Sequence, residues 1–274
     1  MRSKEKTNEM HRRGRIISEL KSQIKEDKAT FIVYLVLRIL VVVAMILSFI
    51  SGHYENVFVC VLSLVLFLVP AFFEKNFGIQ LPSALEIIIL LFIFSAEILG
   101  EMGSYYIKYP FWDTMLHTIN GFLCAAIGFS MVDILNRSDR FKFSLSPIYL
   151  AVVAFCFSMT IGVLWEFFEF GCDMILKTDM QKDTVVSYIS SVDLNSSMEN
   201  KAVVIKNITD TAVNGKSLGI NGYLDIGLID TMKDLLVNFI GAVVFSIIGF
   251  FYVKSRGKGN FAKLFIPTLK RKNK

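Results

Sequence analysis

Long runs of apolar residues alternate with polar stretches along most of the chain. Six of these runs approach the roughly 20 residues with which an α-helix crosses about 30 Å of hydrocarbon. They predict membrane-spanning helices at about 31–50, 57–73, 83–101, 112–135, 147–176 and 231–253. The pattern therefore predicts an all-α integral membrane protein with six transmembrane helices.

The polar stretches divide the chain into five parts. We expect a basic N-terminal tail at 1–28, helices one to five at 29–176, a connection at 177–229, helix six at 230–253 and a basic C-terminal tail at 254–274. The connection at 177–229 mixes β-branched stretches with Asn, Asp, Ser and Gly. Such a mixture predicts either a small hairpin-bearing cap or lid, or a partly disordered excursion.

Composition and charge agree with this organisation and orient it. Hydrophobic residues make up 54% of the chain and charged residues only 19%. The two tails and the second and fourth connections hold 21 of the 29 Lys and Arg residues. By the positive-inside rule both termini are cytoplasmic, and the connection at 177–229 is extracytoplasmic. Basic residues crowded beside membrane helices predict contact with lipid headgroups rather than with nucleic acid.

Polar residues gather at the ends of four helices that are predicted to face outward. Within each helix their spacing of three, four, seven or eight residues keeps them on one face. In chain order they are Glu97 and Glu101, then Asp113, His117 and Asn120, then Glu166, Glu169 and Asp173, and then Asp230, Asp234 and Asn238. We therefore expect one acidic site on the outer side of the membrane.

So many carboxylates need a counter-charge, because neighbouring like charges disfavour ionisation. A divalent metal, Zn, Mn or Mg, suits a mixture of carboxylates and one imidazole. The expected metal ligands are Asp113, His117, Glu166, Glu169, Asp234 and Glu97. The expected catalytic residues are Glu166, Glu169 and His117, with one glutamate as general base on metal-bound water. The expected substrate contacts are Asn120, Asn238 and Trp112.

The same residues also have structural explanations. Asp113 could cap the fourth helix, and Glu101, Asp173 and Asp230 could be solvated interfacial carboxylates. His117 could be a hydrogen-bonded packing residue. Two small-residue pairs, Gly121 with Ala125 and Gly241 with Ala242, predict close helix contacts rather than ligand binding. Arg38, inside the first helix, is expected to snorkel or to pair.

The motifs in the last four helices, taken together, resemble a known family. They are Trp112-Asp113 with His117 and Gly121, then Trp165-Glu166-Phe167-Phe168-Glu169, then Asp230 to Asp234 with Asn238 and Gly241-Ala242. The combination is similar to the YjdF-type family of uncharacterised bacterial multi-pass membrane proteins, and more distantly to the VanZ-like family. The resemblance implies a protein of the bacterial cytoplasmic membrane and supplies no reaction. The VanZ-like comparison implies a link to the cell envelope.

Three functions follow from these residues. The leading hypothesis is a metal-dependent hydrolase or transferase that acts on a lipid or lipid-linked envelope substrate. The second is a proton- or cation-coupled transporter, which requires a polar path that continues inward. The third is a non-catalytic membrane protein that binds lipid or an envelope partner. Nothing in the sequence sets the oligomeric state.

Overall fold

The computed structural model describes residues 28–136, 145–197, 199–255, 257 and 260–269. In this part of the chain six helices are long and apolar enough to cross a membrane, which confirms the predicted fold class. They are α2 (Lys28–Ile50), α3 (Tyr54–Leu66) with α4 (Val69–Phe77), α5 (Ser83–Phe94) with the π-helical segment Ser95–Met102, α7 (Trp112–Asn136), α8 (Pro147–Leu176) and α9 (Leu228–Lys254). The predicted N-terminal tail lies, apart from Lys28, outside the described residues.

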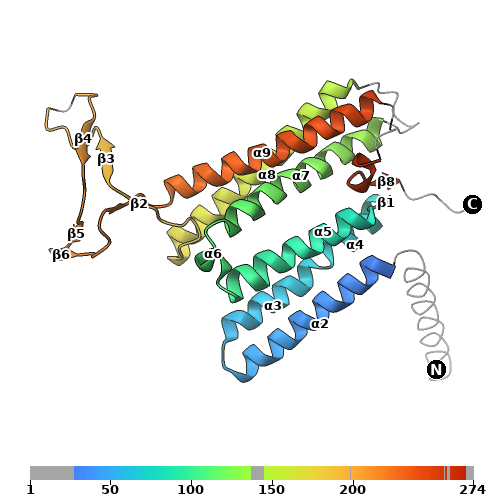
Figure 1. Ribbon diagram of the computed structural model, residues 1–274, viewed down its shortest axis with the longest axis horizontal. Coiled ribbons are helices and arrows are strands. Elements are labelled where there is room, and N and C mark those ends of the chain that lie inside the picture. The colour runs from blue at the N-terminus through green and yellow to red at the C-terminus, as the bar shows by residue number, and fades with distance from the viewer. Residues whose placement is uncertain (1–27, 137–144, 198, 256, 258–259, 270–274) are drawn as a thin grey trace, which may run out of the picture.

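The helices form two groups that lie side by side (Figure 1). The first group contains α2, α3 and α5, and the second contains α7, α8 and α9. Each group has its own apolar core, and α5 contacts α7 between them. We call the end of the helices that carries Trp112, Leu176 and Leu228 the loop end, and the opposite end the tail end. Helix α2 starts and helix α9 ends at the tail end (Figure 1).

The second predicted helix is interrupted in the structure. Helix α3 ends at Leu66, and α4 starts at Val69 with Pro70 in its first turn. Proline lacks a backbone N–H and clashes with the preceding turn, so it is accommodated at a helix start rather than in a helix interior. Pro70 accordingly coincides with a new helix start, and α4 continues to Phe77, beyond the predicted end at 73.

The third predicted helix changes its hydrogen-bond pattern near the loop end. It is α-helical to Phe94 and π-helical from Ser95 to Met102. A short helix, α6 (Tyr105–Lys108), follows. A Cβ atom on Gly100 would lie 2.4 Å from the ring of Tyr106, so only glycine allows α6 to fold back onto the π-helical segment.

Helices α7 and α9 touch through their backbones. A Cβ atom on Gly121 would lie 2.1 Å from the Asn238 carbonyl oxygen, and one on Gly241 would lie 2.1 Å from the Thr118 carbonyl oxygen. Both distances are far below van der Waals contact, so the two glycines are required for this approach. The predicted close contact at these glycines is confirmed.

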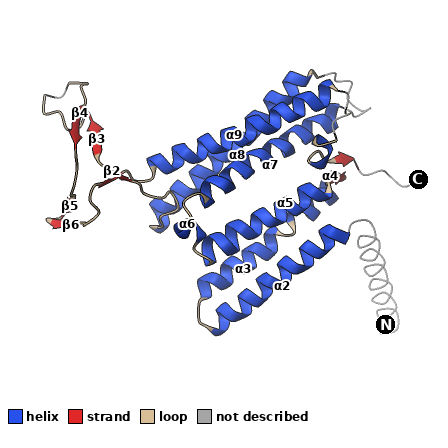
Figure 2. Cartoon of the chain, in the orientation of Figure 1, coloured by secondary structure: helices blue, strands red, loops and turns tan. Residues whose placement is uncertain are grey.

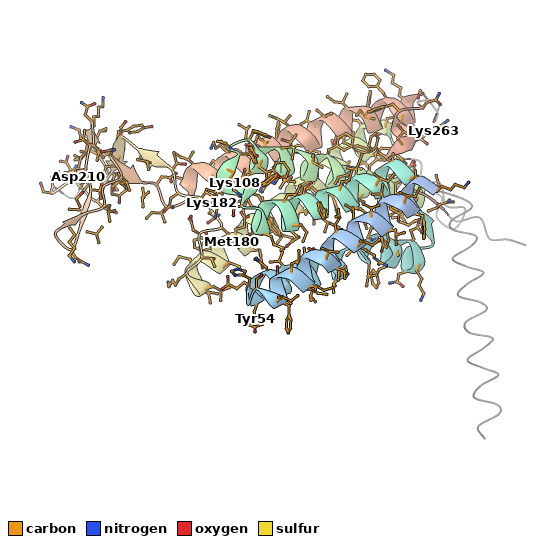
Figure 3. The ribbon with its side chains drawn as sticks, turned by 60° about the horizontal axis from the view of Figure 1, so that its bottom comes forward. Tyr54, Lys108, Met180, Lys182, Asp210 and Lys263 are labelled. Atoms are coloured by element: carbon orange, nitrogen blue, oxygen red, sulfur yellow. The ribbon has the colours of Figure 1, made fainter. Side chains whose placement is uncertain are left out.

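The connection between α8 and α9 contains short antiparallel strand pairs. They are β2 (Val185–Val186) with β7 (Tyr223–Leu224), β3 (Tyr188–Ser191) with β4 (Val203–Lys206), and β5 (Ala212–Val213) with β6 (Lys216–Ser217). We call residues 185–224 the arm, because they extend away from the helices (Figure 2). Met180 and Lys182 lie against the helix ends, whereas Asp210 lies far out on the arm (Figure 3). Most of the connection therefore does not cover the helices.

The two helix groups are also joined at the tail end. Strand β1 (Ile79–Gln80) precedes α5 and pairs with β8 (Thr268–Leu269), which follows the 3₁₀ turn Ala262–Leu264. Phe265 is buried beside this turn, and its ring lies 5.0 Å from that of Phe122 on α7. The C-terminal segment thus packs across both groups.

Candidate metal centre

His117 lies between two aspartates from neighbouring helices. Its Nε2 atom lies 3.5 Å from Asp113 Oδ1, one turn earlier on α7. The same atom lies 3.9 Å from Asp234 Oδ2 on α9. One ligand atom from each residue falls within 4.8 Å of the other two, which makes this group able to hold a metal ion. His117 and Asp234 are buried, at 8% and 3% exposure.

The fold explains why these three residues meet. Helices α7 and α9 both start at the loop end and run in parallel (Figure 1). His117 and Asp234 each lie about one and a half turns inside that end, so they reach the same depth. The glycine contacts at Gly121 and Gly241 lie about one and two turns further along and bring the two helix axes close together.

The distances in the group suit ligands around an ion better than a direct hydrogen bond. A charge-assisted bond between imidazolium and carboxylate is about 2.7–2.9 Å long. Ligand atoms bound to one tetrahedral zinc ion at about 2.0–2.1 Å lie roughly 3.4 Å apart. The His117–Asp113 separation of 3.5 Å is close to that spacing, and the His117–Asp234 separation of 3.9 Å is slightly longer. A divalent cation would also neutralise the two aspartates in a site of low polarity.

Helix α8 adds two buried glutamates beside this group. Glu166 and Glu169 are 4% and 8% exposed, and both lie close enough to Asp234 for their charges to interact. The Trp165 indole N–H donates a 2.9 Å hydrogen bond to Glu169 Oε1. Neither glutamate belongs to the group of three with mutual ligand distances, so their role as metal ligands stays a prediction.

A layer of amides lies beneath the acidic residues. Asn238, which is fully buried, accepts from the Asn120 side chain at 3.4 Å and donates to the Ser158 carbonyl on α8 at the same distance. The Cys124 thiol donates to Asn120 at 3.4 Å. Below them the packed rings of Phe122, Phe129 and Phe245 begin an apolar core. The predicted substrate contacts Asn120 and Asn238 thus bond to each other.

The remaining predicted residues lie on the side of α5. The Trp112 indole N–H donates to the Ser95 carbonyl at 3.3 Å, where the π-helical segment begins. Glu97, on that segment, lies outside the group of three. Tyr106 on α6, whose ring packs against Gly100 of that segment, was missed by sequence reasoning. Burial, and then the charges of Asp113 and the neighbouring glutamates, raise the pKa of Tyr106, so its hydroxyl keeps its proton and can donate to carboxylates.

A short segment crosses the loop end next to these residues. We call residues 177–184 the strap. It begins where α8 ends, at Lys177 in the left-handed conformation. The Gln181 side chain donates to Thr231 Oγ1 on α9 at 2.6 Å and to Glu166 Oε2 at 3.4 Å. Gln181 lies in a polar connection without periodicity, and no sequence signal marked it.

Comparison with known proteins places the chain in a family. The family model described as "Predicted membrane protein (DUF2238)" matches residues 33–255, so the chain belongs to that family. An uncharacterised protein of Thermotoga maritima is 30% identical over 107 residues, which cover 39% of this chain and 53% of that relative. No solved structure matches the chain. The expected membership in a membrane-protein family is confirmed at this level, and the VanZ-like resemblance stays a prediction.

Proposed function

We propose that this protein binds a divalent metal through Asp113, His117 and Asp234 and uses it to hydrolyse or transfer a group on a lipid or lipid-linked envelope substrate. The observation that supports this most is the mutual ligand distance within the buried Asp–His–Asp group. Three protein ligands with further positions left for water or substrate are typical of catalytic metal sites. One nitrogen and two carboxylates favour zinc or manganese over magnesium.

The proposed chemistry assigns roles to the neighbouring residues. The metal, when bound, would polarise a substrate oxygen and activate water. Glu166 would act as the general base, since it lies beside the group and is held by Gln181. Glu169 and Glu97 would supply negative charge around the site. The predicted substrate contacts are already hydrogen-bonded within the protein. A substrate would have to replace these hydrogen bonds in order to bind Asn120, Asn238 and Trp112.

The surroundings of the site favour a lipid substrate. Trp165 is 43% exposed on the outside of α8, while its indole N–H reaches Glu169 on the inside. Phe167 and Phe168 beside it are also exposed. Exposed aromatic residues toward one end of a long membrane helix are typical of the membrane interface. A lipid headgroup at that level would be separated from the acidic residues by one side chain. We place the site on the outer face of the bacterial cytoplasmic membrane, with both termini inside.

The transporter alternative has less support. It requires polar groups that continue from the site toward the tail end. Among the described residues, the amide layer at Asn238 is followed by the rings of Phe122, Phe129 and Phe245. Polar residues nearer the tail end, such as Asp133, are separated from the site by these rings.

Metal binding is tested first, on the purified full chain in detergent after removal of metal. Titration with Zn²⁺, Mn²⁺ and Mg²⁺ should give one tight site in the wild type. His117→Ala and Asp234→Asn should each weaken it by at least about 100-fold, since even residues that only support metal ligands contribute 10–100-fold. Glu101→Gln is the matched control, because Glu101 is an exposed carboxylate at the same end. Absence of a stoichiometric ion, or equal affinity in all four proteins, would reject the metal site.

Catalysis is tested separately on metal-loaded protein in lipid vesicles. Products released from phospholipid and from lipid-linked phosphate substrates would be followed by mass spectrometry. Glu166→Gln should slow turnover by roughly 10²–10⁴-fold, the usual contribution of a general base, while metal affinity changes little. Equal rates in the variant and the wild type would remove Glu166 from the mechanism.

A further inference from the structure

The strap is fixed to both helices of the site by backbone hydrogen bonds. The N–H groups of Met180 and Gln181 donate to the Asp173 carboxylate at the end of α8, at 2.6 and 2.8 Å. The Lys182 N–H donates to Asp230 Oδ2 on α9 at 2.8 Å. The Thr184 N–H donates to Asp225 Oδ1 at 2.7 Å, just before α9. The strap is thus held by Asp173 and Asp230, two carboxylates that the sequence pattern had assigned to the acidic site.

Gln181 is the residue of the strap that reaches the site. Its amide bridges Glu166 on α8 and Thr231 on α9. Its backbone also lies against the start of α9, where a Cβ atom on Gly227 would lie 2.7 Å from Gln181 Cβ and 2.9 Å from its carbonyl oxygen. Gly227 has a φ of +78°, which favours glycine as well. The chain is therefore shaped locally to bring Gln181 this close.

Two of the three residues of the metal group, and Glu166 beside it, are closed from the water side, whereas the Asp113 side chain stays 29% exposed. His117, Asp234 and Glu166 are all less than 9% exposed, although they lie within about three turns of the helix ends. A hydrated ion or a polar headgroup can reach buried ligands only if a covering segment moves. The strap is the covering segment that contacts Glu166, and the Gln181 side chain makes this contact.

We propose that the strap is a gate over the Asp113–His117–Asp234 group and that Gln181 is its latch. This inference rests on the proposed function, because the gate controls exchange of the metal and of substrate at that same site. Release of Gln181 from Glu166 and Thr231 frees the strap between its carboxylate anchors and opens the site to water. The arm continues directly from the strap through the β2–β7 pair, so a force on the arm reaches the gate.

The gate is tested first by the rate of hydrogen–deuterium exchange at the strap amides of the metal-free full chain. Gln181→Ala should speed exchange at residues 180–184 about tenfold, the factor expected from losing one hydrogen bond to a carboxylate. Thr231→Val, which removes the second partner of Gln181, should act in the same direction. Lys182→Ala is the matched control, because the hydrogen bond and ion pair of the Lys182 side chain go to the exposed Asp179 in the described part of the chain. Its charge acts on Asp173 and Asp230 without a direct bond, and its backbone bond to Asp230 remains.

The second readout is metal exchange. Release of bound Mn²⁺ to excess chelator, and its uptake, should both become about tenfold faster in Gln181→Ala, so that the dissociation constant changes less than about threefold. If Gln181 only supports the shape of the metal site, Gln181→Ala should instead change the metal affinity and leave hydrogen–deuterium exchange at the strap amides unchanged. Identical exchange and release rates in Gln181→Ala, Lys182→Ala and the wild type would overturn the gate.

The two proposals can fail separately. If the wild type binds no divalent ion, the proposed function is rejected, and the gate is then judged by amide exchange and by access to Cys124, which lies beneath the site next to Asn120. A small water-soluble thiol reagent, with labelling quantified at the Cys124 peptide, should react faster in Gln181→Ala than in Lys182→Ala. Equal labelling rates would reject the gate in that case too.

Discussion

The two helix groups are built from different contacts. In the group of α2, α3 and α5, apolar side chains such as Leu37, Val41 and Phe67 fill the core. Arg38 is accommodated there by Tyr34, whose hydroxyl accepts from the guanidinium at 2.8 Å and whose ring lies 4.1 Å from it. In the group of α7, α8 and α9, glycines bring backbones into contact, and buried polar residues link all three helices.

This difference has a physical reason. Lipid tails are as apolar as leucine, so apolar side chains alone give a membrane helix little preference for one partner position over another. Backbone contact through glycine and hydrogen bonds between helices fix the separation and rotation of a pair. A metal site needs ligands placed to within about half an ångström. The group that carries the candidate site is the one with these fixed contacts.

The largest expected effect comes from separating α7 and α9. In Gly241→Val the new side chain would overlap the Thr118 carbonyl oxygen, at 2.1 Å from an ideal Cβ atom, and force the helices apart. We expect a loss of about 3 kcal/mol or more in stability, the upper range for overpacking. Metal affinity should fall by at least tenfold, since ligand distances depend on the helix separation. Unfolding in detergent and metal titration of the folded fraction measure the two effects.

Gly171→Val is the matched control for this substitution. Gly171 lies on α8, and nothing lies within 4 Å of the position that its Cβ atom would occupy. The same change in side chain should therefore alter stability only slightly and leave metal affinity unchanged. If both valine variants behaved alike, the backbone contact would not be what holds the site.

A cavity in the other helix group should have a smaller effect and leave the site alone. Phe67 is fully buried in the first group, beside Tyr34. In a soluble protein the cost of Phe67→Ala would include the free energy of transferring the side chain from water to the core. A membrane helix is surrounded by lipid that is as apolar as the core, so only the loss of packing reduces stability here. We expect a loss of about 1–3 kcal/mol in stability, measured by the same unfolding experiment. A drop in metal affinity beyond about twofold would show that the two groups are coupled.

Much of this architecture could be predicted because it depends on local pattern. Six apolar runs of sufficient length define six helices, and the spacing of polar residues assigns each to a face. The small residues around Gly121 and Gly241 pointed to the close contact that brings His117 and Asp234 together. The two ends of each helix could be assigned because the helices alternate in direction.

The sequence could not predict which of the acidic residues meet in the metal group, because this depends on contacts between helices that are far apart in the chain. Nothing in the sequence separated Asp113, His117 and Asp234 from the other expected ligands Glu166, Glu169 and Glu97, because that choice depends on helix separation and rotation. Tyr106 and Gln181 lie in connections, where no periodicity indicates direction. Asp173 and Asp230 have the spacing of site residues but bind backbone N–H groups of the strap.

The smallest expected effect concerns the charge on the strap itself. Partial desolvation, and then the charges of Asp179 and Asp225, raise the pKa of the exposed Asp183, while a hydrogen bond from the Gly227 N–H opposes this. A carboxyl group with a raised pKa in the closed state favours closure while it is protonated, and this contribution is lost as the pH rises through the raised pKa.

Asp183→Asn removes the charge and keeps an oxygen for the Gly227 N–H. Because Asp183 is exposed, we expect only about twofold slower amide exchange at residues 180–184 near neutral pH, and no difference from wild type at acid pH after correction for intrinsic exchange. Titration of the anchoring Asp173 occurs in both proteins and cancels in the comparison. Faster exchange in the variant at neutral pH would show that the Asp183 charge holds the strap closed, and the sign argued from its pKa would be wrong.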